Sequence, residues 1–294
     1  MTIRFGTAGN AQSFYDAGYK KTIQAPEFIA KMGLDAYEYQ CGRGVRIKKD
    51  AAEEFGAAAR EKGIVLSVHA PYYISLSSLE EEKRENSVNY ILQSARAAGQ
   101  MGAKRVVVHS GSCAKRSREE ALELAKATLK RALVKMDEEG LGGVHLCPET
   151  MGKTNQLGTL SEVLALCRLD ERLIPCVDFG HLNARTFGGL KTPEDFKAVF
   201  DEIEDRLGND RMRRMHVHFS KIAYTEKGGE KAHLTFEDTE YGPSFEPAAE
   251  LFARKNCSPV IICESAGTQA EDALRMKRMY EEAKARMEDE SAGR

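Results

Sequence analysis

The sequence predicts a (β/α)8 barrel, also called a TIM barrel, on two observations. Eight short runs rich in Val, Ile, Leu and Tyr alternate with longer amphipathic segments, and several runs lack the polar alternation of a half-exposed strand. Successive strands lie roughly 30–40 residues apart, the spacing of strand-plus-helix units in such barrels. The predicted strands are residues 3–8, 35–40, 64–69, 105–109, 144–149, 174–179, 215–219 and 260–264. A doubly wound open sheet is the alternative, but no G-x-G-x-x-G follows the first strand.

The segments between the strands carry helix signals. Ser117 and Glu120 have the spacing of a capping box and precede a long amphipathic stretch. Thr192 and Pro193 suit an N-cap and the first helical position, and Gly208 suits the end of that helix. Each segment therefore supplies the helix that a barrel needs between two strands.

Length and composition favour one large domain. The chain has 294 residues with 42% apolar residues, enough for a sizeable core, and no linker-like segment interrupts it. We predict a single domain over residues 1–288 and a disordered tail over 289–294. The net charge of −2 excludes a uniformly basic nucleic-acid coat, although a local basic groove is compatible with it.

Cysteine usage indicates a reducing compartment. The seven cysteines form no C-x-x-C pair, and their odd number disfavours a complete disulfide framework. No apolar run approaches the ~20 residues of a membrane span, and residues 1–10 lack the architecture of a signal peptide. We expect a cytoplasmic protein with no membrane partner and no obligate protein partner.

Ionisable residues recur at the C-terminal ends of the predicted strands, where barrel enzymes carry their active sites. These residues are His69, His109, Glu149, Asp178, His181, His216, His218 and Glu264. A single histidine of this kind is most often a hydrogen-bonded core residue, but so many at one mouth indicate metal binding. Imidazole and carboxylate groups are ligands for zinc and manganese, and a cation would be the partner that a buried Asp178 needs. Their number exceeds what one ion takes, so we expect two or three ions.

A long interval follows the seventh strand. About twenty residues, from 220 to 240, show neither helical nor strand periodicity, and they contain His233. Structureless loops longer than ~12–15 residues are uncommon in compact domains and tend to be functional or disordered. We therefore expect a functional loop that brings His233 to the mouth.

Six motifs at the strand ends resemble those of endonuclease IV, a family of apurinic/apyrimidinic endonucleases in the xylose-isomerase-like TIM barrel superfamily. The motifs are "HAPYYISL" (69–76), "VVVHSGS" (106–112), "CPET" (147–150), "VDFGH" (177–181), "MHVHFSK" (215–221) and "ICES" (262–265). The resemblance runs from about residue 64 to 280. It implies a DNA-repair hydrolase that incises damaged duplex DNA 5′ to abasic sites with a zinc-activated hydroxide.

The resemblance also implies three groups of ligands. His69, His109 and Glu149 would hold the first ion, and Glu149 would bridge to a second. The second would also take Asp178, His216 and Glu264, and the third would take His181 and His233. Glu149 and Glu264 are the expected catalytic residues.

One departure affects the third group. The family has an aspartate two residues before its last loop histidine, where this sequence has Lys231. A protonated lysine cannot be a metal ligand. We expect Glu230 or His218 to substitute, or the third ion to be weakly held.

A second departure affects DNA contacts. The early DNA-contacting stretch of the family has no counterpart, and residues 39–50 stand in its place. Tyr72, Arg43 and Lys221 remain the candidates for DNA contact. Basic residues after the second and fourth strands, among them Arg116 and Arg118, are also placed to contact phosphates.

A sugar isomerase or epimerase is the alternative function. The quartet Glu149, Asp178, His216 and Glu264 is also similar to the single-metal site of such enzymes on the same barrel, in which the two glutamates act as acid and base. That chemistry does not use His69, His109 or His233. These three histidines therefore decide between the two functions.

Overall fold

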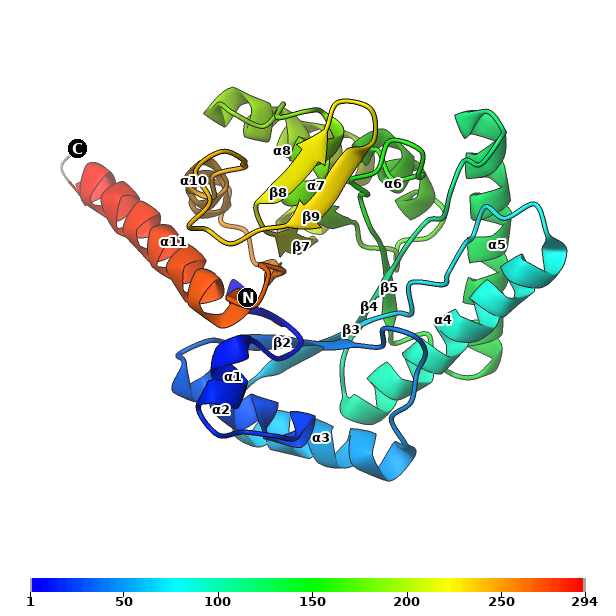
Figure 1. Cartoon of the computed structure of the whole chain (residues 1–294), viewed down its shortest axis with the longest axis horizontal. Helices are drawn as coiled ribbons and strands as arrows, with labels where there is room; N and C mark the ends of the chain where they lie inside the picture. The colour runs from blue at the N-terminus through cyan, green and yellow to red at the C-terminus, as the bar shows by residue number, and fades with distance from the viewer. Residues whose placement is uncertain (1, 293–294) are drawn as a thin grey trace.

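The structure, a computed structural model, describes residues 2–292 and confirms the barrel (Figure 1). Eight parallel strands form one sheet in the order β5-β4-β3-β2-β1-β10-β7-β6. They are β1 Arg4–Ala8, β2 Ala36–Gln40, β3 Val65–His69, β4 Arg105–Val108, β5 His145–Pro148, β6 Cys176–Asp178, β7 His216–Phe219 and β10 Val260–Cys263. The two end strands, β5 and β6, approach each other through a parallel bridge between Glu149 and Cys176. The backbone N–H of Ile174 donates to the carbonyl of Leu146 over 3.1 Å and extends this closure.

Each strand lies within the run that the sequence predicts. In β4 the residues Val106, Val107 and Val108 are all fully buried, because one face packs on helices and the other fills the barrel interior. A continuous apolar run is therefore what this position requires.

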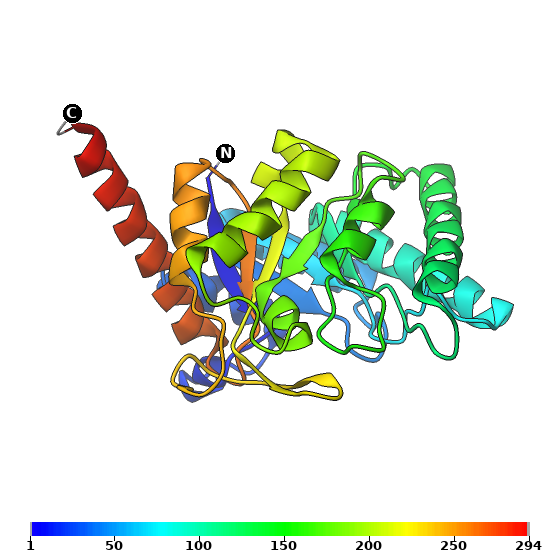
Figure 2. The same ribbon diagram turned by 90° about the horizontal axis from the view of Figure 1, so that it is seen from above.

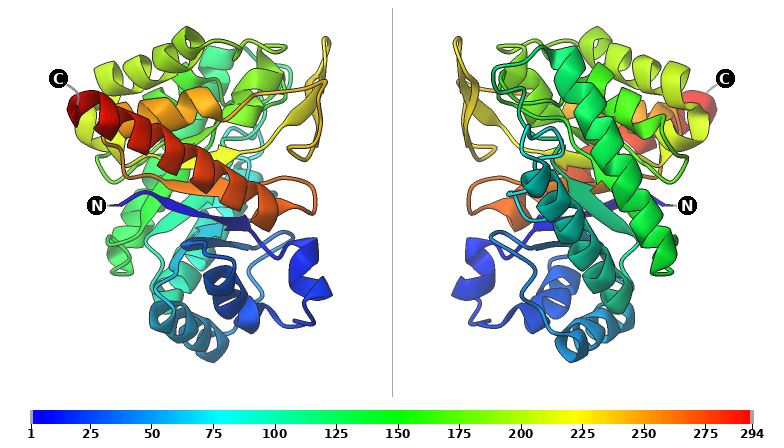
Figure 3. Two further views of the ribbon diagram at one scale, coloured as in Figure 1. Left: turned by 90° about the vertical axis from the view of Figure 1, so that its left-hand side faces the viewer. Right: turned by 90° about the vertical axis from the view of Figure 1, so that its right-hand side faces the viewer.

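The helices surround the sheet, as the ribbon views show (Figures 1 and 3). They are α1 Gln12–Asp16, η1 Thr22–Gln24, α2 Ala25–Lys31, α3 Lys49–Glu61, α4 Glu81–Met101, α5 Arg118–Glu138, α6 Leu160–Cys167, α7 Phe179–Arg185, α8 Pro193–Leu207, α9 Asn209–Arg213, α10 Glu246–Arg254 and α11 Gln269–Ala292. The capping box of Ser117 and Glu120 is formed at the start of α5. Thr192 caps α8, and Gly208 follows its last residue.

The interval after β7 is a β-hairpin, which corrects the prediction of a structureless loop. Strands β8 Ile222–Thr225 and β9 Gly229–His233 pair antiparallel, and the hairpin lies on the side of the barrel away from the N-terminus (Figures 2 and 3). Both strands are short and only partly buried, and they lack the apolar alternation that would have revealed them.

Two glycines let this hairpin dock on the loop that follows β5. The backbone N–H of Glu230 donates to the carbonyl of Gly152 over 3.1 Å. A Cβ on Gly229, which has φ +74°, would lie 2.3 Å from that carbonyl oxygen, and a Cβ on Gly152 would lie 2.6 Å from the Cβ of Glu230. The close approach places β9 at the mouth of the barrel.

The chain ends in the long helix α11, which projects from the body of the molecule (Figure 1). This helix continues to Ala292, so residues 289–292 of the predicted tail are helical, and residues 293–294 lie outside the described residues. Within residues 2–292, no helix has both the length and the apolar character needed to cross a membrane.

Candidate metal centre

A pocket of about 310 Å³ opens at the C-terminal ends of the strands. Its walls include His69, His109, Glu149 and Glu264 from strand ends. The hairpin contributes Glu230 and His233, and Figure 2 shows the hairpin lying over this end of the barrel. The structure thus brings most of the predicted ligands into one cavity, as expected for the active end of a barrel.

Glu149, which follows β5, lies at the centre of these residues and is buried. Its Oε2 lies 3.1 Å from His109 Nε2 and 3.5 Å from His69 Nε2. Its Oε1 lies 2.8 Å from His218 Nδ1. The two oxygens therefore face two different sets of histidines, which is the arrangement of a bridging carboxylate.

One ring nitrogen of His69 is hydrogen-bonded to the backbone. Its Nδ1 lies 2.9 Å from the carbonyl of Ala70, a contact in which the ring must donate. A neutral His69 therefore turns the lone pair of Nε2 toward the Glu149 carboxylate. A proton or a cation between nitrogen and oxygen is needed to make that contact favourable.

A second group combines Glu149 with Asp178, His218 and Glu264, whose ligand atoms all lie within 4.8 Å of one another. The structure places His218 here in the position predicted for His216. Because alternate residues of β7 share a face, both histidines point into the barrel, and His216 lies one layer deeper. His216 contacts Glu38 instead, with 2.9 Å between Nε2 and Oε2.

A third group consists of His181, Glu230 and His233. His181 Nδ1 lies 2.9 Å from the carbonyl of Thr150, which leaves Nε2 facing Glu230 Oε2 at 3.5 Å. The hydroxyl of Ser220 lies 2.8 Å from His233 Nδ1 and orients that ring. Glu230 is the residue beside the two histidines, and Lys231 next to it is exposed.

The histidines and carboxylates perturb one another strongly. Burial disfavours the charged form of His69, but Glu149, together with Glu38 and Glu264, outweighs burial and raises the pKa of His69 to about 9. Burial also disfavours the charged form of His181, but Asp178 and Glu149 together raise its pKa to about 9. Burial raises the pKa of Asp178 despite the nearby His181. Such clustered shifts are typical of functional sites.

The donor set fits divalent cations. Glu149 Oε2 and Asp178 Oδ2 are buried oxygens without a hydrogen-bond partner among the described residues. Buried carboxylate oxygens are costly when unpaired, and a cation in their midst removes that cost. Mixed imidazole and carboxylate ligands suit zinc or manganese.

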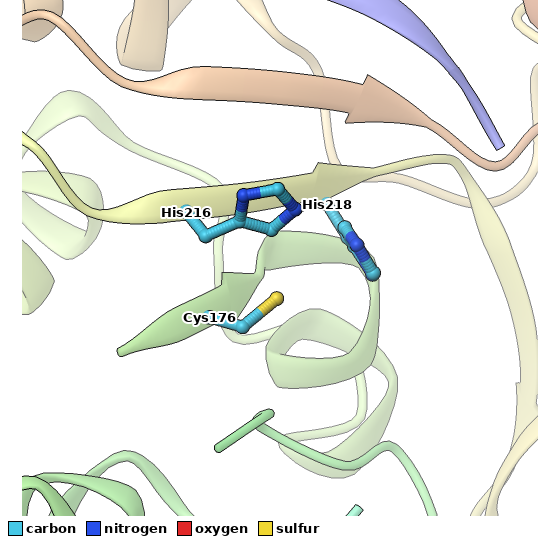
Figure 4. A group of neighbouring side chains, drawn as sticks. All are labelled: Cys176, His216 and His218. Atoms are coloured by element: carbon cyan, nitrogen blue, oxygen red, sulfur yellow. The ribbon is translucent and has the colours of Figure 1, made fainter. Parts of the chain in front are cut away.

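A deeper group, Cys176 with His216 and His218, lies inside the barrel on β6 and β7 (Figure 4). It differs from the groups at the mouth because both nitrogens of His216 already have partners, Glu38 on one side and Arg105 on the other. The guanidinium cation beside His216 opposes a metal ion there. Burial, against the opposing effect of Glu38, lowers the pKa of His216 to about 4, so this ring is neutral.

The structure places the residues proposed for DNA contact in different surroundings. Tyr72 lines the pocket and is 50% exposed, and Arg43 is also exposed. Lys221 instead contacts the backbone carbonyls of Phe236 and Asp238 through its Nζ. These contacts hold the segment that follows the hairpin.

Arg116 and Arg118, which were predicted to contact phosphates, also contact groups of the protein itself. Arg118 pairs with Glu162, with 2.6 Å between Nε and Oε1, and contacts backbone carbonyls of the same loop region. Arg116 contacts the carbonyl of Ser77. Both arginines therefore brace loops around the mouth.

Sequence reasoning missed two charged residues that the structure places near the site. Lys153 lines the pocket, and Glu38 is fully buried in the barrel beneath it. Glu38 had a signal, because it is a carboxylate within a predicted strand, "DAYEYQ". Lys153 had none, since a loop lysine is ordinarily a surface residue.

The fold and these groups of ligands define a metal-binding TIM-barrel enzyme. Residues 26–286 match the family described as xylose isomerase-like TIM barrel, and the chain belongs to this family.

The chain is also similar to curated proteins. It is 34% identical over 277 residues to the uncharacterized protein MJ0133 of Methanocaldococcus jannaschii, covering 94% of this chain and 97% of that protein. It is 28% identical over 228 residues to a "Probable endonuclease 4" of Cenarchaeum symbiosum, covering 75% and 79%.

Solved structures of two kinds share the fold. Endonuclease IV from Thermus thermophilus superposes with a TM-score of 0.67 at 22% identity, covering 95% of this chain and 98% of that one. A D-tagatose 3-epimerase-like protein superposes with a TM-score of 0.69 at 18% identity, covering 98% and 100%. Nucleases and sugar epimerases are both represented among the structural neighbours.

Proposed function

We propose that this protein is a metal-dependent phosphodiester hydrolase that acts on DNA, as the similarity to endonuclease IV suggests, with zinc as its metal. The observation that carries the proposal is the position of His69 and His109. Both direct Nε2 at Glu149 Oε2, while the other oxygen of Glu149 faces His218 in the second group. A single-metal site has no use for two additional histidines on the far oxygen of a carboxylate.

We assign metal binding to the three groups of ligands and catalysis to two of their carboxylates. The three groups would hold the ions, which supply positive charge for a phosphate and lower the pKa of a bound water. Glu149 joins the first two groups through its two oxygens, and Glu264 completes the second. These two are the carboxylates we propose as catalytic.

Pocket residues outside the ligand groups suit a nucleic-acid substrate. Lys153 brings a positive charge to the wall of the pocket, where a backbone phosphate would sit. Tyr72 presents its ring at the rim, tilted by 39° against the ring of Tyr73 with 4.3 Å between ring centroids. An exposed aromatic pair at this position supports contact with an unstacked base or an abasic gap.

The test combines ion counting with cleavage. Zinc-loaded wild-type protein should hold at least two ions per chain by elemental analysis and should incise a duplex that carries one abasic site. His109→Ala should lose one ion and at least about 100-fold in incision rate, because a ligand of the first group is removed.

The second candidate is a sugar isomerase or epimerase, favoured by the quartet of Glu149, Asp178, His218 and Glu264 around one metal position. Wild-type protein with one ion or fewer, and epimerisation of sugars that survives His109→Ala, would replace the hydrolase with this function.

A further inference from the structure

A buried carboxylate, Glu38, lies on β2 directly beneath the mouth and belongs to none of the ligand groups. Its side chain is fully buried in the barrel interior. Isolated buried charges are expensive, so the groups around Glu38 determine what it does there.

Three neighbours direct donors at this carboxylate. Ser67 Oγ donates to Oε2 over 2.8 Å, and His216 Nε2 lies 2.9 Å from the same oxygen. Gln40 donates its side-chain N–H to Oε1 over 3.2 Å. Glu38 is therefore held as an ionised carboxylate in one orientation.

The protonation of His216 follows from its other neighbour. Arg105 places Nη1 3.4 Å from His216 Nδ1, and its guanidinium also donates to the carbonyls of Met215 and Arg214. A guanidinium only donates, so Nδ1 of His216 accepts and its proton sits on Nε2. That proton points at Glu38 and fixes the carboxylate from below.

The remaining contact reaches a proposed metal ligand. His218 Nε2 lies 3.0 Å from Glu38 Oε1, while His218 Nδ1 lies 2.8 Å from Glu149 Oε1 and 3.5 Å from Glu264 Oε1. His218 Nε2 makes no aligned hydrogen bond among the described residues, and its other polar neighbour is Cys176 of the deeper group. Rotation of the ring toward Oε1, 3.0 Å away, would align its Nε2–H with that oxygen.

We propose that Glu38 is a positioning residue for the metal centre: it accepts the Nε2–H of His218 and so turns the Nδ1 lone pair of that ring toward the quartet. Carboxylate–histidine–metal arrangements fix the tautomer and the orientation of the ligand and raise its basicity. The inference rests on the metal binding in the proposed function, and it explains why His218, two residues beyond His216, supplies the ligand.

The rival explanation is that Glu38 only stabilises the barrel interior. Glu38→Gln separates the two roles, because it keeps the size of the side chain and removes the charge. Loss of a carboxylate that orients a metal ligand typically weakens metal affinity by roughly 10–100-fold. A purely structural role lowers the melting temperature and leaves every metal affinity unchanged.

The control is Glu162→Gln, which removes the charge of another buried carboxylate. Glu162 pairs with Arg118 and caps α6, and it contacts none of the proposed ligands. Both variants are titrated with zinc in competition with a chelator, and Co²⁺ absorption spectra report the ligand geometry.

We expect Glu38→Gln to weaken one bound ion by roughly 10–100-fold, to alter the Co²⁺ spectrum, and to leave the other ions unaffected. Glu162→Gln should bind all ions as the wild type does. Wild-type zinc affinities and an unchanged cobalt spectrum in Glu38→Gln would overturn the positioning role. A wild-type protein that binds no zinc would instead refute the proposed function, and this inference with it.

A measurement on the wild type decides the matter if Glu38→Gln does not fold. In zinc-loaded protein with ¹⁵N-labelled histidine, long-range ¹H–¹⁵N spectra identify the protonated nitrogen of each ring. We expect His218 to carry its proton on Nε2. A proton on Nδ1 would overturn the proposal.

Discussion

The mouth and the interior of the barrel are built from the same residue types but differ in how their polar atoms are paired. In the interior, Glu38 receives donors from Ser67, Gln40 and His216. At the mouth, Glu149 Oε2 and Asp178 Oδ2 have no hydrogen-bond partner among the described residues. The comparison teaches that histidines and carboxylates alone do not mark a metal centre; unpaired ligand atoms that converge on one point do.

The largest predicted effect distinguishes two histidines on the same strand, β7. His218→Gln should cost one ion and more than about 100-fold in activity, because it removes a member of the quartet. His216→Gln should keep the full number of ions and lower the free energy of unfolding by about 1–3 kcal/mol, the cost of leaving Glu38 short of a buried donor. Elemental analysis and urea denaturation of both variants measure these effects. Equal ion loss in the two variants would contradict the division into two layers.

Protons should compete with metal ions for the histidine nitrogens at the mouth and not for those in the interior. His69 and His181 each have a pKa of about 9, raised by neighbouring carboxylates against the effect of burial, so at pH 7 both hold protons that a metal must displace. Metal affinity should therefore rise with pH from 6 to 9, by about tenfold per pH unit for each proton released, and level off above that range. Calorimetric titrations in buffers of different ionisation enthalpy count the released protons. An affinity independent of pH between 6 and 9 would show that these rings are not ligands.

A substitution at Asp178 tests whether the buried ligands at the mouth lower the free energy of unfolding of the metal-free protein. Burial raises the pKa of Asp178, so its ionised form opposes folding once the pH exceeds the unfolded value, about 3.9. In chelator-treated protein at neutral pH, Asp178→Asn should leave the free energy of unfolding unchanged or raise it by about 1 kcal/mol. Added zinc should then stabilise the variant less than the wild type, because only the second group has lost a ligand. A loss of stability in the chelator-treated variant would indicate that Asp178 serves the fold.

The smallest expected effect concerns the rim. Tyr72→Ala should raise KM for an abasic duplex by about 5-fold, because an aromatic contact with a base at a half-exposed rim is worth about 1 kcal/mol, the low end of the usual range. The number of bound ions should not change, since Tyr72 belongs to none of the ligand groups. Steady-state kinetics with matched abasic and intact duplexes measure the effect. An unchanged KM would remove Tyr72 from the substrate surface.

The fold was accessible from sequence because a parallel barrel imposes a strong local pattern. Runs such as Val106–Val108 are buried on both faces and cannot be mistaken for loops. The hairpin at Ile222–Thr225 and Gly229–His233 was missed because its strands are short and only partly buried, and its position depends on Gly152, far away in the sequence.

The site was predicted to the level of the strand end but not to the individual side chain. Alternate residues of a strand point the same way, so the sequence alone does not say which of His216 and His218 lies at the depth of Glu149. The register of β7 beside β6, which pairs His218 with Asp178, decides it. Glu38 and Arg105 were overlooked because their partners lie across the barrel, at sequence separations that no local pattern records.

We infer that cations occupy the mouth and not the interior of the barrel, and anomalous scattering from crystals of the zinc-loaded protein locates each ion. We expect one peak beside Glu149 Oε2 and the two histidines His69 and His109, and another among Glu149 Oε1, Asp178, His218 and Glu264. An ion at Cys176 and His216, or no ion next to His69 and His109, would contradict the claim.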